Sequence, residues 1–375
     1  MNKAAWWIGL GVLVVIGVGI YAYQKHSLNT SGAIKIGAAL GLTGYGSAWG
    51  EGEREAIQLA VEEFNAKGAL QVQVITEDTK STGEGTVNAI TKLVNVDHVL
   101  AIIGPTWGDS FQGAYPLTQQ KHVPIITPSG AMETIENKSK LDYLFSTWLP
   151  QQPETAALVQ YLLNHNLTRV ATVTDLDAFN KKATEIFIAT ATAKGLTVVS
   201  HEEVPIGTTD FRTLITKLKS LQPQAVFVNL QDTSSIGPFN QQLKDLGVKT
   251  LLFGVTSVEN PENLQKFPHF FDGMVYSFPH ISQTASYQSF AQAFKQRYGQ
   301  APAGPSVVAG YNAALMLLAA LNTGATTGEQ LKAALNKVHT PGVGVEDLSF
   351  NSNGQISGAE FEIKTIKDNQ FVTVE

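Results

Sequence analysis

Short runs of β-branched and apolar residues alternate with longer segments of helical periodicity from Ile34 onward. This alternation is the signature of βαβ units, in which helices cover both faces of a parallel sheet. The runs fall into two sets, which predict two Rossmann-like lobes and an α/β fold with parallel sheets. The expected strands are 34–40, 72–77, 99–103 and 123–126 in the first lobe, and 169–174, 197–202, 225–230 and 251–254 in the second.

The segment 52–67 illustrates the helical pattern. Its apolar residues, such as Ile57 and Ala60, fall on one side of the helix, and Gly68 suits the turn that ends it. The charged residues Glu53 and Glu62 fall largely on the other side. We therefore expect the apolar side to face the core and the charged side to face solvent.

The pattern changes after residues 273–278. Three helical segments follow one another, and then a hairpin-like end, at 284–298, 306–321, 327–338, 360–364 and 370–374. We interpret this as a return to the first lobe before the chain finishes in the second. The expected lobes are 33–147 with 279–344, and 148–278 with 345–375.

Repeated crossings of this kind predict a multi-strand hinge, near Trp148, Phe278 and Gly344. Several connecting strands permit the lobes to close but resist twisting. A ligand is expected in the cleft between the lobes, where carboxyl ends of parallel strands and amino ends of helices converge.

The amino-terminal segment indicates a membrane. Lys3 precedes an apolar run from Ala4 to Tyr23, which is long enough to cross a bilayer core of about 30 Å as one helix. We expect residues 1–32 to be an anchor or uncleaved signal, with the rest on the extracytoplasmic side of the cytoplasmic membrane. Cleavage near Ser31 and Ala33 is the alternative, although those residues lie far beyond the apolar core.

Composition removes several classes of function. The net charge is −6, and no basic run supplies the surface that a nucleic acid backbone requires. The chain has no cysteine, which excludes disulfides, thiolate metal sites and thiol nucleophiles. The eight histidines lack metal-ligand spacing, and serine-hydrolase and P-loop motifs do not occur. We therefore expect no metal, no cofactor and no catalytic residues.

Five stretches, taken in their order and spacing, resemble the type I periplasmic solute-binding proteins, in the branch of the leucine/isoleucine/valine-binding proteins. They read IKIGAALGLTGYGSAWGEGEREAIQLAVEEFNAKG, LVNVDHVLAIIGPTWGDS with VPIITPSG, TDFRTLITKLKSLQPQAVFV, GYNAALMLLAAL and LSFNSNGQISGAEFEIKTIKDNQFV. The resemblance implies a binding protein that closes two lobes around a small solute and delivers it to an ABC-type permease.

Two loops of the first lobe resemble the family's ligand loops. GPTWGDS follows a strand and opens a helix, where the unpaired backbone N–H groups of Gly108, Asp109 and Ser110 could hold an anionic group. Family members commonly carry a hydroxyl residue at the place of Gly108. In TPSGA, Ser129 and Ala131 occupy the contact positions, and Ala131 replaces a threonine that is frequent in the family.

In the second lobe, Thr256 stands where amino-acid binders of the family usually carry an acidic residue for the ligand's ammonium group. Gln231 is a further polar candidate beyond a strand end. Trp49 and Phe179 fall where the family offers aromatic cover, and Trp107 adds another ring. We therefore expect an amino acid-like, amide, or aromatic or aliphatic acid ligand.

Two alternatives remain open at this point. A ligand-sensing subunit for a membrane partner would share the same fold and cleft. A dinucleotide-dependent enzyme is suggested by the spacing of Gly44, Gly46 and Gly50 between a strand and a helix. Several residues separate Leu40 from Gly44, however, so these glycines do not form the tight turn that pyrophosphate binding needs.

Overall fold

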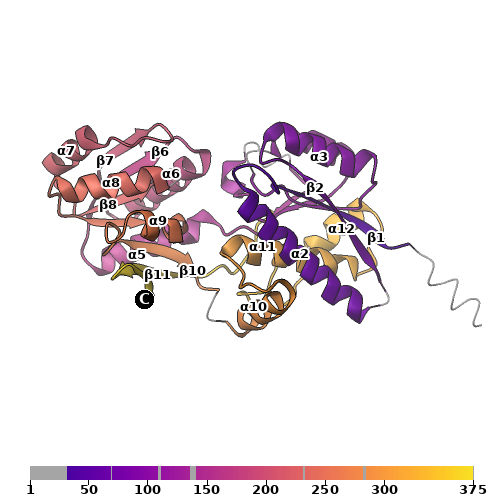
Figure 1. Ribbon diagram of the computed structural model, residues 1–375. Coiled ribbons are helices and arrows are strands. Elements are labelled where there is room, and N and C mark those ends of the chain that lie inside the picture. Colours follow the sequence, from indigo (N-terminus) through magenta and orange to yellow (C-terminus); the bar gives the residue numbers. More distant parts are fainter. Residues whose placement is uncertain are drawn as a thin grey trace, which may run out of the picture.

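Two β-sheets organise the protein into two lobes (Figure 1). The structure, a computed structural model, describes residues 32–68, 70–108, 111–135, 141–230, 233–281 and 284–374. The membrane helix expected from Ala4 to Tyr23 lies outside these residues. Among the helices that are described, none combines the length and the apolar character needed to cross a bilayer.

The first sheet has five parallel strands in the order β2-β1-β3-β4-β5. Its strands are β1 (Ile34–Leu40), β2 (Val72–Asp78), β3 (Ile102–Ile103), β4 (Ile125–Thr127) and β5 (Leu144–Ser146). The helices of this lobe are α2 (Ser47–Lys67), α3 (Gly83–Asn95), α4 (Tyr115–Gln120), α10 (Ala285–Tyr298), α11 (Pro305–Leu321) and α12 (Gly328–Leu335).

The second sheet has seven strands in the order β12-β11-β10-β9-β8-β6-β7. β6 (Arg169–Asp175), β7 (Thr197–Val204), β8 (Ala225–Asn229), β9 (Leu251–Gly254) and β10 (Val275–Pro279) are parallel. The hairpin of β11 (Phe361–Lys367) and β12 (Gln370–Thr373) adds an antiparallel edge. The helices are α5 (Gln151–Asn164), α6 (Ala178–Ala193), α7 (Arg212–Leu221), α8 (Thr233–Asp245) and α9 (Pro261–Lys266).

The predicted α/β class with parallel sheets is confirmed. Each of the eight expected strands forms, although β3 and β4 are shorter than expected, and β5 is an additional strand of three residues. The helix expected from residue 52 begins at Ser47. The expected position of Glu53 is wrong, because this residue is fully buried against the core instead of facing solvent.

Helix α11 shows how a late segment completes the first lobe. Nearly every residue of α11 is buried, and the helix packs against α2 and α12 and over β3 and β4. Met316 and Leu317 lie in the same apolar core as Ile36 of β1 and Ile57 of α2. The core of the first lobe therefore requires residues that follow all five parallel strands of the second sheet, β6 to β10, in the sequence.

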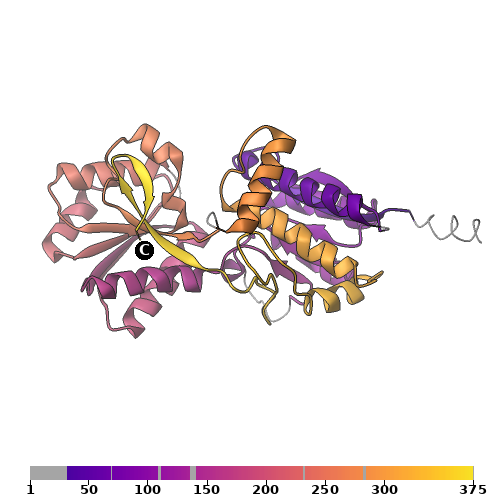
Figure 2. The same cartoon turned by 90° about the horizontal axis from the view of Figure 1, so that it is seen from below.

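The chain passes between the lobes at three places (Figure 2). The first lies between β5 and α5, and the second between β10 and α10. The third precedes β11, because Leu348, Phe350 and Ile356 still pack in the core of the first lobe.

The start of α2 lies unusually close to the loop after β1, which generates a test of the packing. A β-carbon on Gly50 would stand 2.3 Å from the carbonyl oxygen of Gly41, and backbone atoms cannot yield as a flexible side chain would. We expect Gly50→Ala to lower the free energy of unfolding by about 1–3 kcal/mol, as overpacking does. Gly83→Ala is the matched control, since nothing lies within 4 Å of its new β-carbon. Equal stability of the two variants in urea denaturation would contradict this packing.

Candidate functional site

The loop after β1 is shaped by side chains from the end of β2 and just beyond it. Asp78 accepts hydrogen bonds from the backbone of Leu42 at 3.0 Å and of Thr43 at 3.2 Å, and from the Thr43 hydroxyl at 2.6 Å. Ser81 donates to the Thr43 carbonyl at 2.7 Å and accepts from the Gly46 N–H at 3.3 Å. Burial raises the pKa of Asp78, but the hydrogen bonds from Thr43, Lys80 and Leu42 outweigh it, so the net pKa is lowered and the carboxylate stays charged.

The glycines of this loop make room for an aromatic ring. A β-carbon on Gly46 would stand 1.5 Å from the Trp107 ring, so this ring lies directly on the Gly46 backbone. Gly50 allows the close approach of α2 to Gly41 described above. Two of the three glycines that suggested a dinucleotide loop, Gly46 and Gly50, are thus accounted for by the packing of Trp107 and α2.

Four aromatic side chains form a continuous row at this edge of the first lobe. Tyr45 stacks on Trp107 with ring centroids 5.0 Å apart, Trp107 lies 6.1 Å from Trp49, and Trp49 lies 5.8 Å from Trp148. Tyr45 is 78% exposed and Trp49 is 40% exposed, whereas Trp148 is buried. We call these four residues the aromatic row. Its exposed members offer an apolar surface to a bound molecule.

The aromatic row continues into the second lobe through Phe179. Trp148 packs with Ala131 and Ala309 of the first lobe, and Phe179, in the first turn of α6, packs against this group. Asp177 fixes the position of Phe179, because its side chain accepts hydrogen bonds from the Phe179 N–H at 2.9 Å and the Asn180 N–H at 3.1 Å. The structure therefore brings together Trp49, Trp107, Ala131 and Phe179.

A buried carboxyl group holds the loops of the first lobe together. Thr106, after β3, donates to Glu53 Oε2 at 2.8 Å and accepts from the Gly41 N–H at 3.1 Å. Ser129, after β4, donates to Glu53 Oε1. Burial raises the pKa of Glu53 to about 8, although the hydrogen bonds from Ser129 and Thr106 oppose this rise. Glu53 is therefore largely uncharged at neutral pH.

Gly108 and Ser129, which were also expected in the site, lie on the same edge of the first lobe. Gly108 is buried against Gly130, Ala131 and Ile135, so the two predicted ligand loops touch each other. A β-carbon at position 108 would find only ordinary contacts of 3.5 Å. The Ser129 hydroxyl is already directed to Glu53. Asp109, Ser110 and Gln231 lie outside the described residues.

Thr256 of the second lobe contacts a carboxyl group that sequence reasoning missed. The Thr256 N–H donates to Glu154 Oε1 at 2.9 Å, and the Thr256 hydroxyl donates to the same oxygen. Ser277 of β10 donates to it at 3.4 Å. Glu154 is almost completely buried, and this burial raises its pKa, with a further increase from nearby Glu133 and a decrease from the Thr256 and Ser277 hydrogen bonds.

Polar contacts join the lobes beside Phe179. Glu133, in the short 3-10 helix η2 (Met132–Thr134), accepts from the Gln151 N–H at 3.2 Å and from Gln355 Nε2 at 3.1 Å. Gln151 Nε2 donates to the Phe179 carbonyl at 3.2 Å. An open pocket of about 400 Å³ lies between η2 and α6, lined by Glu133, Thr134, Ile135, Ala178, Lys181, Lys182 and Glu185.

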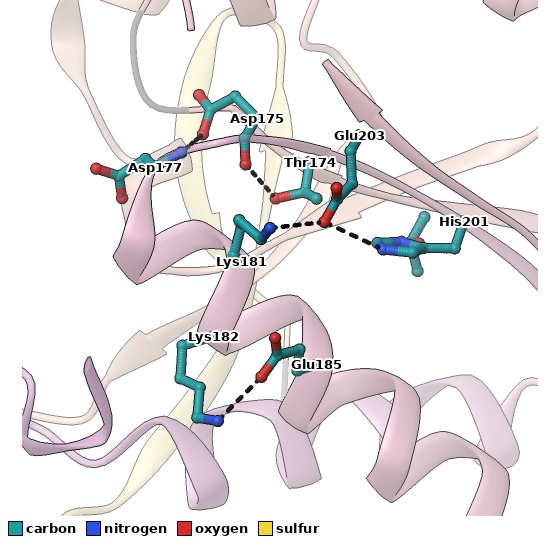
Figure 3. A network of polar contacts seen from close by, with 9 residues as sticks. Thr174, Asp175, Asp177, Lys181, Lys182, Glu185, His201 and Glu203 are labelled. Carbon is teal, nitrogen blue, oxygen red and sulfur yellow. Dashed lines mark hydrogen bonds and ion pairs between the residues drawn. The ribbon is translucent and has the colours of Figure 1, made fainter. Parts of the chain in front are cut away.

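The lysines of this pocket have partners within the second lobe (Figure 3). Lys181 lies 3.2 Å from Glu203, which also lies 3.7 Å from His201, and Lys182 lies 2.9 Å from Glu185. Over the described part of the chain, no group of three or more histidine, aspartate or glutamate side chains is placed to hold a metal ion. The site therefore consists of aromatic rings, hydroxyls, amides and separate carboxyl groups.

The sequence profile of the family described as periplasmic binding protein matches residues 33–364. A Leu/Ile/Val-binding protein of Rhizobium johnstonii is 28% identical over 232 residues, which are 61% of this chain and 63% of that protein. A Leu/Ile/Val-binding protein homolog of Brucella melitensis is 24% identical over 352 residues, covering 91% of this chain and 94% of the relative.

Solved structures share the fold. The substrate-binding protein of a branched-chain amino acid transporter from Streptococcus pneumoniae, crystallised with isoleucine, has a TM-score of 0.75 and 22% identity, covering 91% of this chain and 99% of that one. A solute-binding protein of an ABC transporter from Rhodopseudomonas palustris was crystallised with 3,4-dihydroxybenzoic acid. It has a TM-score of 0.77 and 22% identity, and the match covers 92% of this chain and 96% of that one.

The raised pKa of Glu53 predicts a pH dependence of stability. Because the pKa rises from 4.5 to about 8 on folding, the folded protein retains a proton that the unfolded chain loses between these values. The contribution of this group to the free energy of unfolding is therefore full below pH 4.5 and is lost as the pH rises to about 8. We expect Glu53→Gln, which cannot titrate, to remove this decline in urea denaturation at pH 5, 6.5 and 8.

Glu62→Gln on the same helix is the control for this measurement. The hydrogen bond from Arg297 lowers the pKa of Glu62 from its ordinary value of 4.5. Glu62 therefore titrates below the range of pH 5 to 8 in which stability is measured. An identical decline in the wild type and in Glu53→Gln would show that Glu53 does not carry the effect.

Proposed function

The chain belongs to the periplasmic binding protein family, and on that premise we propose that it is the solute-binding protein of an ABC-type uptake system. The proposed site is the edge where the two lobes meet, and the proposed activity is binding and release without a catalytic step. The binding domain works on the extracytoplasmic side of the membrane.

The aromatic row gives this proposal its main support. It runs along the carboxyl edge of the first sheet and reaches Phe179, at the carboxyl edge of the second. Ligands of open α/β sheets bind at such edges. Two exposed rings, Tyr45 and Trp49, offer contact area that the core does not use. A small solute with an apolar or aromatic body fits this surface best.

We propose that the solute is amino acid-like, an amide, or an aromatic or aliphatic acid. Its apolar body contacts Trp49, Trp107 and Phe179. The proposed polar contacts are Gly108, Asp109, Ser110, Ser129, Ala131, Gln231 and Thr256. Since the hydroxyls of Ser129 and Thr256 already donate to buried carboxyl groups, these residues offer a ligand mainly their remaining acceptor capacity and their backbone.

Closure of the lobes follows from the same arrangement. A solute held by both lobes makes its full contacts only when they approach, so it stabilises the closed state. We propose a multi-strand hinge at the three crossings, with lobes of 33–147 plus 279–344 and 148–278 plus 345–375. The core packing of Leu348, Phe350 and Ile356 supports a last crossing nearer to β11 than to Gly344.

Delivery to a membrane permease completes the proposed role. A retained helix within residues 1–32 would hold the protein at the membrane and raise its effective concentration near the permease. No described feature of this site favours a ligand-sensing subunit over a transport protein. Gly46 packs against Trp107, and Gly50 packs against Gly41. This packing explains the two glycines without a dinucleotide cofactor.

A thermal-shift panel tests the proposal. We expect at least one unmodified amino acid, amide or aromatic acid to raise the melting temperature, because a ligand at 100 times its Kd stabilises the folded state by about 2.7 kcal/mol. Trp49→Ala and Phe179→Ala should each reduce this shift while leaving the unliganded protein folded. A shift with a nicotinamide dinucleotide alone, or no change in either variant, would contradict the proposed site.

A further inference from the structure

The first crossing between the lobes is short and is fixed at its start. Residues 147–150 alone separate β5 from α5. Ser146, the last residue of β5, accepts a hydrogen bond from the Trp148 N–H at 3.0 Å and donates to the Gly130 carbonyl at 2.8 Å. A contact that also holds the far end of this crossing, at Gln151, therefore determines how the second lobe is placed relative to the first.

Helix α5 begins without a side-chain cap from its own N-cap residue. That residue is Pro150, whose side chain has no hydrogen-bond acceptor, and the acidic residue of the first turn, Glu154, accepts from Thr256 instead. The first N–H groups of a helix have no partner within the helix, and the positive end of the helix dipole favours a negative charge. An acceptor from elsewhere in the chain therefore stabilises this end of α5.

Glu133 of the first lobe supplies such an acceptor. Its Oε1 accepts a hydrogen bond from the N–H of Gln151, the first residue of α5, at 3.2 Å. Glu133 belongs to η2, which also contacts α6 of the second lobe. A carboxylate of one lobe therefore caps a helix of the other.

Gln355 holds the Glu133 carboxylate in this position. Its Nε2 donates to both carboxylate oxygens, at 3.1 Å to Oε1 and 3.2 Å to Oε2. Gln355 is buried and forms a parallel bridge with Ser146, and the next residue, Ile356, packs in the core of the first lobe. The segment that leads to the third crossing is thus joined to the end of the first crossing through one carboxylate.

The same contact extends to the aromatic ring of the second lobe. Gln151 Nε2 donates to the Phe179 carbonyl at 3.2 Å, and Phe179 packs against Trp148, Ala131 and Ala309. The backbone of Gln151 is thus held by the first lobe, while its side chain holds Phe179. Glu133 therefore acts on the position of Phe179 through Gln151.

We propose that Glu133, Gln151 and Gln355 form an interlobe clasp, which holds the angle between the lobes in the unliganded protein. Glu133 is its central positioning residue, and Gln355 orients it. Without the carboxylate, water satisfies the first N–H of α5, and the lobes gain freedom to separate. The clasp is a property of the fold, and only its effect on binding, through Phe179, rests on the proposed function.

Distances between the lobes of the unliganded full chain test the clasp. The sequence contains no cysteine, so Ala66→Cys in α2 and Thr213→Cys in α7, both at exposed positions, place one spin label on each lobe. We expect Glu133→Ala to broaden the distance distribution in pulsed electron paramagnetic resonance. The population at the wild-type distance should fall by about half or more, since loss of a hydrogen bond to a charged group shifts an equilibrium by about tenfold.

Glu133→Gln tests whether the hydrogen bond itself carries the effect. This variant loses the charge but keeps one acceptor oxygen for the Gln151 N–H. Its distance distribution should therefore lie between those of the wild type and Glu133→Ala. A distribution as broad as that of Glu133→Ala would contradict a role for the remaining acceptor.

Glu185→Ala is the matched control, because Glu185 lines the same pocket but pairs with Lys182 of its own helix. It should leave the distance distribution unchanged. Gln355→Ala removes the group that orients Glu133, so it should also broaden the distribution, and combining it with Glu133→Ala should add little, as residues that act as a unit do. Gln355→Ala keeps the test informative if Glu133→Ala fails to fold.

The outcomes separate the clasp from the proposed function. A Glu133→Ala distribution that matches the wild type, or an equal broadening in Glu185→Ala, would overturn the clasp. Neither result would affect the proposed solute-binding function, because no solute is present in this measurement. Failure of the whole thermal-shift panel would overturn the proposed function and leave the clasp in place.

Discussion

The carboxyl group of Glu53 is the interaction on which the binding edge of the first lobe depends. It accepts hydrogen bonds from Thr106 and Ser129, which follow two different strands, and Thr106 in turn accepts from Gly41 after a third strand. Three loops are thereby fixed relative to one helix. Because the site is fully buried, the carboxyl group remains largely protonated, which avoids the cost of an unpaired charge in the core. The loops on which the aromatic row is built are positioned by this group.

The second lobe also contains a buried carboxyl group, that of Glu154. Glu154 lies in the first turn of α5 and accepts from Thr256, which follows β9, and from Ser277 of β10. Each buried carboxyl group therefore holds together segments of its own lobe that are distant in the sequence.

The sequence predicts the fold more fully than the site. Hydrophobic periodicity identifies the eight main strands, but β5 is only three residues long and gives no periodic signal. Glu53 and Glu154 both fall on the apolar stripes of their helices, beside Ala56 and Leu158, which was the available signal. It is easily missed, because charged residues are rarely buried and their partners are distant in the sequence. The contacts of Trp148 with Trp49 and Phe179 depend on tertiary packing, which local pattern does not reveal.

The most direct test of the central claim is a crystal structure of the protein with the solute that stabilises it most. The account predicts that this solute lies between the carboxyl edges of the two sheets, with its apolar body on Trp49 and with contacts to residues of both lobes. A solute bound to one lobe alone, or outside this edge, would contradict the account.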